Sequence, residues 1–211
     1  MDRKAHWDSM YRTEDRKRVG WYQAEANVSL RLIQQHVPDL RSPIIDVGGG
    51  ASVLVAQLHA AGYRDLTVLD LSGAAIAIAQ ANLGPTVATI RWIETDILTA
   101  QLSPGHYGLW HDRAVFHFLT DPADRARYVA QARGAVAPGG YVLVASFAED
   151  GPTHCSGLEV MRYSAQSLQA QFGEEFTFLE AQREEHRTPG GQVQAFIYCV
   201  CRRRPGAPVS S

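Results

Sequence analysis

The sequence predicts an α/β protein built on one doubly wound, mostly parallel sheet of seven strands. Residues 42–70 contain a short apolar run, a glycine-rich turn, a helical segment and a second apolar run, which is the pattern of a βαβ unit. Apolar runs and segments of helical spacing continue to alternate after it. A short turn joins the last two runs, which is typical of an antiparallel pair. We expect the strand order 3-2-1-4-5-7-6, with the last strand antiparallel.

The length of the chain favours a single domain. With 211 residues it can bury an ordinary hydrophobic core, and no linker or repeat divides it. We expect one domain over residues 1–202. The tail at 203–211 is rich in Pro, Gly and Ser, and we predict that it is disordered.

Residues 4–36 precede the first predicted strand and are expected to form a helical segment. A charged stretch at 14–18 interrupts it and is interpreted as a solvated face, and residues 24–36 have the spacing of a helix. Four aromatic residues stand out: Trp7, Tyr11, Trp21 and Tyr22. Their side chains could form a satellite core or a lid over a bound ligand, and the sequence favours neither.

The βαβ unit carries the clearest functional signal. Its first strand, Pro43–Val47, is too short for a helix, and Gly48, Gly49 and Gly50 follow it. Glycines admit a ligand close to the backbone amides, and the start of the next helix, at 51–58, favours an anionic group. The second strand, Leu66–Leu69, ends on Asp70, at the offset where an acid accepts hydrogen bonds from a ribose. The unit predicts a site for a nucleoside with a small anionic group.

The glycine pattern argues against a dinucleotide. Gly48 and Gly50 match the first two glycines of G-x-G-x-x-G, but Val53 occupies the third position. The close packing that admits a pyrophosphate is then missing. A nicotinamide-dependent oxidoreductase is therefore the weaker rival.

The other elements follow from short runs and turn residues. Further strands are predicted at 89–93, 107–111, 141–147, 176–182 and 192–202. Further helices are predicted at 73–82, 123–136 and 164–171, the first two with Ser72 and Asp121 as N-caps. Residues 148–163 are interpreted as a long loop.

The pattern Asp46-Val47-Gly48-Gly49-Gly50 resembles the D-x-G-x-G motif of class I S-adenosylmethionine-dependent methyltransferases, and the likeness extends over residues 6–202. The resemblance implies a Rossmann-like fold, S-adenosylmethionine as cofactor and S-adenosylhomocysteine as product. It implies that Asp46 lies near the methionyl amino group, Asp70 at the ribose, and Asp96 and the Ile97 amide at the adenine. The remaining predicted cofactor-binding residues are Trp7, Tyr11, Trp21, Gly48, Gly49, Gly50, Ser52, Leu71, Asp112 and Arg113.

Several short motifs are similar to a branch that contains lysine methyltransferases of a translation elongation factor and of citrate synthase. They are Trp7-x-x-x-Tyr11, Trp21-Tyr22, Ser52, Gly62-Tyr63, Asp70-Leu71-Ser72 and Asp112-Arg113. The chain departs from that branch, which carries Asp-Lys-Gly-Thr, at residues 113–115. This departure lies on the substrate side and is more similar to small-molecule methyltransferases.

Methyl transfer from a sulfonium is an in-line displacement, so the main task of such an enzyme is to hold the reactants in line. A thiolate or arsenite-like nucleophile needs no further base, whereas an amine or hydroxyl must lose a proton. The predicted catalytic residues are His117, His154 and Cys155, and His111 and Asp112 are expected at the same edge of the sheet. Cys155 could capture a soft substrate.

We expect a methyltransferase that acts on a small-molecule or protein nucleophile. The alternatives are a protein lysine methyltransferase and a non-catalytic S-adenosylmethionine-binding protein. The net charge of −2 and the lack of a long apolar run predict no nucleic-acid or membrane partner, and we expect a monomer or weak dimer. The spacing of Cys155, Cys199 and Cys201 predicts neither a disulfide framework nor a metal site, and a cytoplasmic location is expected.

Overall fold

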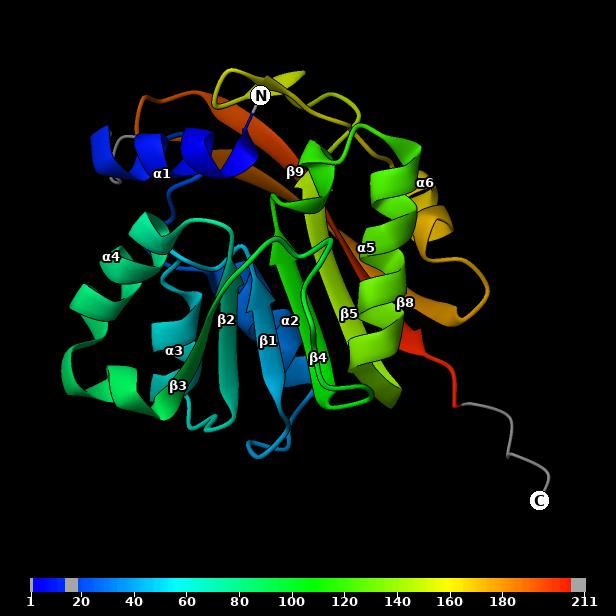
Figure 1. Ribbon diagram of the computed structural model, residues 1–211. Coiled ribbons are helices and arrows are strands. Elements are labelled where there is room, and N and C mark those ends of the chain that lie inside the picture. Colours follow the sequence, from blue (N-terminus) through cyan, green and yellow to red (C-terminus); the bar gives the residue numbers. More distant parts are fainter. Residues whose placement is uncertain (1, 14–18, 206–211) are drawn as a thin grey trace.

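The computed structural model describes residues 2–13 and 19–205, which form a seven-stranded sheet between two layers of helices (Figure 1). The strand order is β3-β2-β1-β4-β5-β9-β8, and β9 is antiparallel to both of its neighbours. The sheet strands are β1 (Ile44–Val47), β2 (Leu66–Asp70), β3 (Ile90–Glu94), β4 (Tyr107–Arg113), β5 (Val136–Phe147), β8 (Phe176–Arg187) and β9 (Val193–Arg203). Since β8 and β9 are the sixth and seventh strands of this sheet, the predicted order and the antiparallel last strand are confirmed.

Six α-helices and two short 3-10 helices connect the strands within the described residues. The α-helices are α1 (Arg3–Thr13), α2 (Asn27–His36), α3 (Leu54–Ala60), α4 (Gly73–Leu83), α5 (Pro122–Ala135) and α6 (Ala165–Phe172). The 3-10 helices are η1 (Gly84–Thr89) and η2 (Phe116–Phe118). The predicted caps are present, because the side chains of Ser72 and Asp121 accept from backbone N–H groups of α4 and α5.

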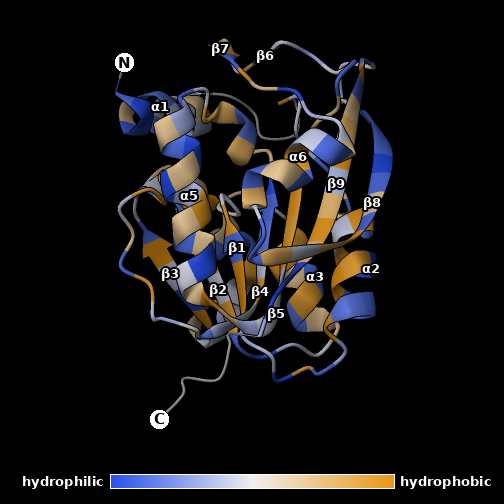
Figure 2. Ribbon diagram, turned by 90° about the vertical axis from the view of Figure 1, so that its right-hand side faces the viewer, coloured by the Kyte–Doolittle hydropathy of each residue, from blue (hydrophilic) through white to orange (hydrophobic). Residues whose placement is uncertain are grey.

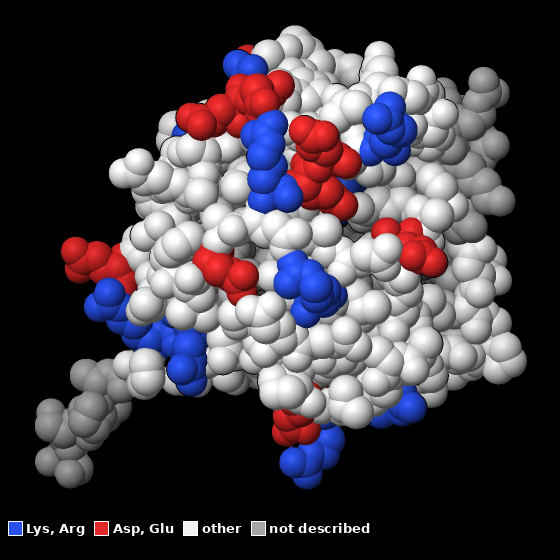
Figure 3. All heavy atoms as spheres, turned by 180° about the vertical axis from the view of Figure 1, so that it is seen from behind, with Lys and Arg blue, Asp and Glu red and all other residues white. Residues whose placement is uncertain are grey.

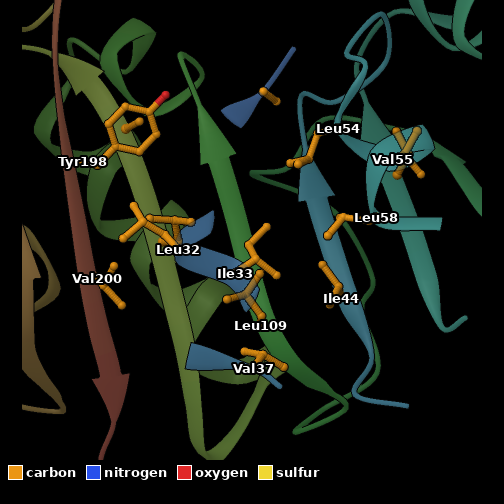
Figure 4. Packing of buried hydrophobic residues seen from close by; sticks show 14 of the residues in the cluster. Leu32, Ile33, Val37, Ile44, Leu54, Val55, Leu58, Leu109, Tyr198 and Val200 are labelled. Atoms are coloured by element: carbon orange, nitrogen blue, oxygen red, sulfur yellow. The ribbon is translucent and has the colours of Figure 1, made fainter. Parts of the chain in front are cut away.

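Each face of the sheet has its own hydrophobic core. On one face, side chains of α2 and α3 pack against β1, β4 and β9 (Figure 4). On the other face, Trp110 of β4 lies among residues of α5 and α6, and its indole N–H donates to Tyr128 at 2.8 Å. Figure 2 shows the resulting pattern, with hydrophobic strands inside and helices of mixed hydropathy outside. Strands buried on both faces explain why the apolar runs of the sequence are continuous rather than alternating.

The structure corrects several predicted boundaries. Residues 148–163 are not only a loop, because β6 (His154–Cys155) and β7 (Leu158–Glu159) form a small hairpin there. The fourth strand extends through Arg113, and β8 continues to Arg187 beside β9. Arg203 of the predicted tail belongs to β9, and the tail beyond residue 205 lies outside the described residues. The charged stretch at 14–18 also lies outside them.

Helix α1 lies across the carboxyl ends of the strands (Figure 1). Polar contacts fasten it there: Lys4 Nζ lies 2.7 Å from a Glu94 carboxylate oxygen, and Ser72 Oγ donates to Asp8 at 2.7 Å. None of its residues is fully buried, so α1 is held mainly at its rim. It covers the edge of the sheet at which parallel α/β proteins bind ligands.

On the face shown in Figure 3, acidic and basic side chains stand in small mixed groups, and neither sign forms a continuous patch. Among residues 2–13 and 19–205, no helix has the length and hydrophobicity that a membrane crossing requires.

Candidate functional site

Two adjoining pockets open at the carboxyl ends of β1, β2 and β4. The first lies under α1 and extends from Asp70 and Asp96 to Phe118 and Cys155. The second lies beside the start of α3 and extends from Asp46 to Tyr22. Tyr11, Trp21, Val47, Gly48 and Arg113 line both pockets, so a single elongated ligand could occupy the two.

Asp70 lies at the end of β2 and is buried against the glycine-rich turn. Its carboxylate accepts from the Gly50 amide at 2.9 Å and from the Ser72 amide at 2.8 Å. A Cβ at Gly50 would lie 2.7 Å from an Asp70 oxygen, so only glycine lets this turn approach the acid. Each carboxylate oxygen can accept a second hydrogen bond, and Asp70 also lines the first pocket. Burial raises the pKa of Asp70 to about 6, against the effect of its two amide donors.

Gly48 is the point at which β1 turns into the site. Its φ is +71°, and a Cβ there would lie 2.0 Å from the Val115 side chain. Both conditions require glycine at this position. Ser52, two residues further than Gly50, lines the second pocket and also accepts from the Leu54 amide at 3.0 Å.

The two predicted adenine-side residues, Asp96 and Ile97, follow β3 and line the first pocket. Leu71, predicted to bind the cofactor, follows the neighbouring strand β2 and lines the same pocket. One Asp96 oxygen accepts from the Leu98 amide at 2.9 Å, which fixes the turn. An acid and an apolar side chain are thereby placed side by side at the pocket wall, opposite α1.

Asp46 lies on β1 and is 3% exposed. Its Oδ1 lies 2.7 Å from His111 Nδ1, whereas its Oδ2 is buried without a hydrogen-bond partner. Asp46 is also one of the residues that line the second pocket, and its Oδ2 keeps its capacity to accept hydrogen bonds.

The aromatic residues of the first 22 positions gather over the site. The Trp7 ring lies 5.0 Å from Phe118 and 5.8 Å from Trp21, in both cases edge to face. Tyr11 lies 6.2 Å from Trp21. These four side chains line the first pocket, and Tyr22 lines the second. They are therefore placed as a roof over the pockets, and they also pack against one another.

Arg113 lies nearly buried at the junction of the two pockets. Its Nε donates to the Tyr198 hydroxyl at 2.9 Å, and its Nη1 donates to the Trp21 carbonyl at 3.3 Å. Its guanidinium stacks 4.1 Å from the centre of the Phe196 ring. Nη2 lies 3.5 Å from a Glu184 oxygen but makes no hydrogen bond. Arg113 thus ties the C-terminal strands to the pocket wall.

The structure separates the three predicted catalytic residues. Only Cys155 lines a pocket, and burial raises the pKa of its thiol to about 11. His154, the neighbouring residue in β6, is exposed. His117 is fully buried against Phe118 and Phe147, where burial lowers its pKa to about 3. The sequence predicts His117 at the site, but the turn of η2 directs its ring into the core instead.

Asp112 also lies elsewhere than predicted. It is fully buried, and its carboxylate accepts from the Tyr128 hydroxyl and from the amides of Val115 and Phe116. Burial raises its pKa to about 6 despite these donors. The contacts hold the turn after β4, so Asp112 shapes the pocket through Val115 and does not line it.

Two residues at the site could not be identified from the sequence. Phe118 joins the aromatic roof because η2 turns it toward α1, and Ser29 reaches His111 from α2 at 2.9 Å. Both contacts join segments far apart in the chain, so local spacing could not reveal them.

The chain is similar in sequence to a protein family and to individual curated proteins. Residues 44–140 match a family described as a methyltransferase domain. An uncharacterized methyltransferase of Mycobacterium tuberculosis is 29% identical over 116 residues, which cover 55% of this chain and 56% of the relative. The EEF1A lysine methyltransferase 2 of Homo sapiens is 22% identical over 157 residues, covering 68% of this chain and 66% of that protein. The chain thus spans just over half the length of the mycobacterial relative.

Among solved structures, the N-methyltransferase NodS of Bradyrhizobium japonicum, in complex with S-adenosylhomocysteine, superposes with a TM-score of 0.73. The two sequences are 18% identical, and the alignment covers 96% of this chain and 99% of NodS. This likeness establishes the fold, and the family match covers residues 44–140.

Proposed function

We propose that this chain, whose residues 44–140 match a methyltransferase-domain family, transfers a methyl group from S-adenosylmethionine to a nucleophile on a small molecule or protein. The observation that carries the proposal is the convergence of three acids on the paired pockets. Asp46, Asp70 and Asp96 lie in or just after three adjacent parallel strands. Acids at these places can hold an ammonium, a ribose and an adenine amino group.

The residues present fit such a cofactor. Asp46 Oδ2 is a buried acceptor without a partner, which suits the methionyl ammonium. Asp70 has acceptor capacity left for ribose hydroxyls, and Gly50 leaves the space that a Cβ would fill. Leu71 and Ile97 supply apolar contact for the adenine. When bound, the cofactor would supply an electrophilic methyl group that an acceptor displaces in line.

The roof residues exclude water and favour a cation. Tyr11 and Trp21 line both pockets and Trp7 lines the first, and each well-placed ring attracts a cation by about 0.5–2 kcal/mol. We assign Phe118, Arg113 and Cys155 to the acceptor side of the first pocket. Because its pKa is raised, Cys155 keeps its proton near pH 7, so we assign it to contact with the acceptor and not to attack.

A lysine side chain is the second candidate acceptor. The relationship to EEF1A lysine methyltransferase 2 supports it, at 22% identity. The acceptor would then be part of a protein partner, and the unpaired Nη2 of Arg113 would lie near an incoming amine. That arrangement is electrostatically unfavourable, so a small-molecule acceptor is the better-supported class.

A screen with S-adenosylmethionine carrying a labelled methyl group tests the proposal. The acceptors are thiols, amines, hydroxy acids, arsenite and lysine-bearing proteins. We expect label in one class, and none with Gly48→Val, whose side chain would clash with Val115. Binding of S-adenosylhomocysteine without transfer to any acceptor would indicate a non-catalytic binding protein. Absence of both binding and transfer would overturn the proposal.

A further inference from the structure

Three buried side chains from different elements, all of which line the second pocket, form one hydrogen-bonded chain. Ser29 Oγ of α2 lies 2.9 Å from His111 Nε2 of β4, and His111 Nδ1 lies 2.7 Å from Asp46 Oδ1 of β1. Their exposed fractions are 1%, 3% and 3%. We call this arrangement the Asp46 relay. A buried aspartate needs such partners, because an unpaired carboxylate is costly away from water.

The relay leaves one carboxylate oxygen for a ligand. His111 uses Oδ1, and Oδ2 has no hydrogen-bond partner although it is buried. Gly49 lies over this oxygen, and a Cβ there would be 2.2 Å from it. Of the three relay residues, Asp46 alone has an acceptor that is both unpaired and at the pocket wall.

The chemistry of the relay explains why these residue types suit it. An aspartate only accepts, so the hydrogen between Asp46 and His111 is on Nδ1. Nε2 can then accept from the Ser29 hydroxyl, which fixes the tautomer and the orientation of the ring. With the ring fixed at both nitrogens, rotation of the Asp46 carboxylate would break a charge-assisted hydrogen bond.

We propose that His111 and Ser29 are positioning residues that hold Asp46 Oδ2 toward the ammonium group of the bound amino-acid portion of the cofactor. The inference rests on the proposed function, because it takes the second pocket as the methionyl end of the cofactor site. It assigns a role to Ser29, and it gives His111 a positioning role in place of direct contact with an acceptor.

Two ligands separate positioning from a merely structural role. S-adenosylhomocysteine carries the ammonium group, whereas 5′-methylthioadenosine has the same nucleoside without the amino acid. We expect His111→Gln to weaken binding of S-adenosylhomocysteine about 10-fold or more, the effect of losing a charge-assisted hydrogen bond. Binding of 5′-methylthioadenosine should change less than about 3-fold, since it does not contact Asp46.

Ser29→Ala is the second, milder variant. We expect it to weaken binding of S-adenosylhomocysteine selectively, by a smaller factor than His111→Gln does. Ser146→Ala is its matched control, because Ser146 is a fully buried serine whose hydroxyl has no partner. It should leave the affinity for both ligands unchanged. If either relay variant weakened the two ligands equally, or neither ligand, the positioning role would be wrong. Failure of the wild-type protein to bind either ligand would instead overturn the proposed function.

Discussion

Asp70 performs two tasks with one buried carboxylate. It anchors the glycine-rich turn through the amides of Gly50 and Ser72, and it faces the first pocket. The amides favour its charged form, whereas burial favours the neutral form and has the larger effect on its pKa. A bound ribose would add hydroxyl donors and stabilise the carboxylate further. The affinity of the site and the charge of this residue are therefore linked.

Replacement of Asp70 by asparagine should strongly weaken cofactor binding. The amide loses acceptor capacity toward ribose hydroxyls, and hydrogen bonds to a charged group are worth about 1.5–3 kcal/mol each. For two such bonds we expect S-adenosylhomocysteine affinity to fall about 100-fold or more in titration calorimetry. Asp65→Asn, an exposed position before the same strand, is the matched control. An unchanged affinity in Asp70→Asn would remove Asp70 from the ribose site.

The pKa of Asp70 also predicts how binding depends on pH. Because the pKa is raised to about 6 and the ribose requires the carboxylate, binding releases a proton below that pH. Affinity for S-adenosylhomocysteine should therefore rise from pH 5 to pH 6.5 and level off above. Asp70→Asn should show a flatter profile over this range. A wild-type affinity independent of pH would contradict the assignment.

The raised pKa of Asp70 affects the stability of the ligand-free protein in the opposite direction: its contribution to the free energy of unfolding falls as pH rises. The folded state keeps a proton on Asp70 that the unfolded chain releases from about pH 3.8 upward. The contribution of Asp70 to the free energy of unfolding thus decreases as pH rises through this window, up to the folded pKa near 6. Difference measurements between wild type and Asp70→Asn isolate this contribution.

At the scale of elements, α1 and residues 21–22 form the roof of the site. The rings of Trp7, Tyr11 and Trp21 contact one another and Phe118, while polar contacts hold the helix rim. A helix without fully buried residues opens at low free-energy cost. A ligand that fills the space below would add contacts to it.

We therefore predict that S-adenosylhomocysteine protects residues 1–23 from limited proteolysis. Trp21→Ala should weaken binding of this ligand more than it lowers the melting temperature of the ligand-free protein, because Trp21 lines both pockets. Equal cleavage with and without ligand would favour the alternative of a satellite core.

The hairpin of β6 and β7 brings Cys155 into the first pocket, while Cys199 and Cys201 lie in β9. All three thiols are buried and have a raised pKa, so alkylation of the folded protein at pH 7.5 should be slow. We expect Cys155 to react first, and bound S-adenosylhomocysteine to slow it further. Peptide mapping after timed alkylation identifies the residue. Faster labelling of a β9 cysteine would contradict the placement of this hairpin.

The sequence predicted the sheet because each buried strand is a compact apolar run with its own turn residues. The same reasoning placed Asp46, Asp70 and Asp96 at the carboxyl edge of the sheet, where they line the two pockets, and their roles in binding stay predictions. It misplaced His117, because a short 3-10 turn decides whether that ring faces the pocket or the core. It missed the contact of Ser29 with His111, which joins residues 82 positions apart. The direction of a side chain in a turn depends on tertiary packing, and so do the contacts between distant elements. A local sequence pattern does not contain that information.

At the scale of the whole molecule, the sheet joins an N-terminal parallel half to a C-terminal antiparallel pair. Arg113 connects the two halves, through Tyr198 of β9 and the ring of Phe196. The site therefore depends on segments far apart in the chain: α1 and residues 21–22 form the roof, and β9 supports the guanidinium at the pocket junction.

The position of β9 has a consequence for synthesis on the ribosome. This strand is made after both β5 and β8, yet it lies between them in the sheet. Until residues 193–203 have left the exit tunnel, the backbone of β5 presents an open edge, and β8 has no partner in the sheet. Open strand edges invite pairing with other chains. The nascent chain thus stays vulnerable to aggregation until β9 has been made, and a product truncated before residue 193 would need a chaperone.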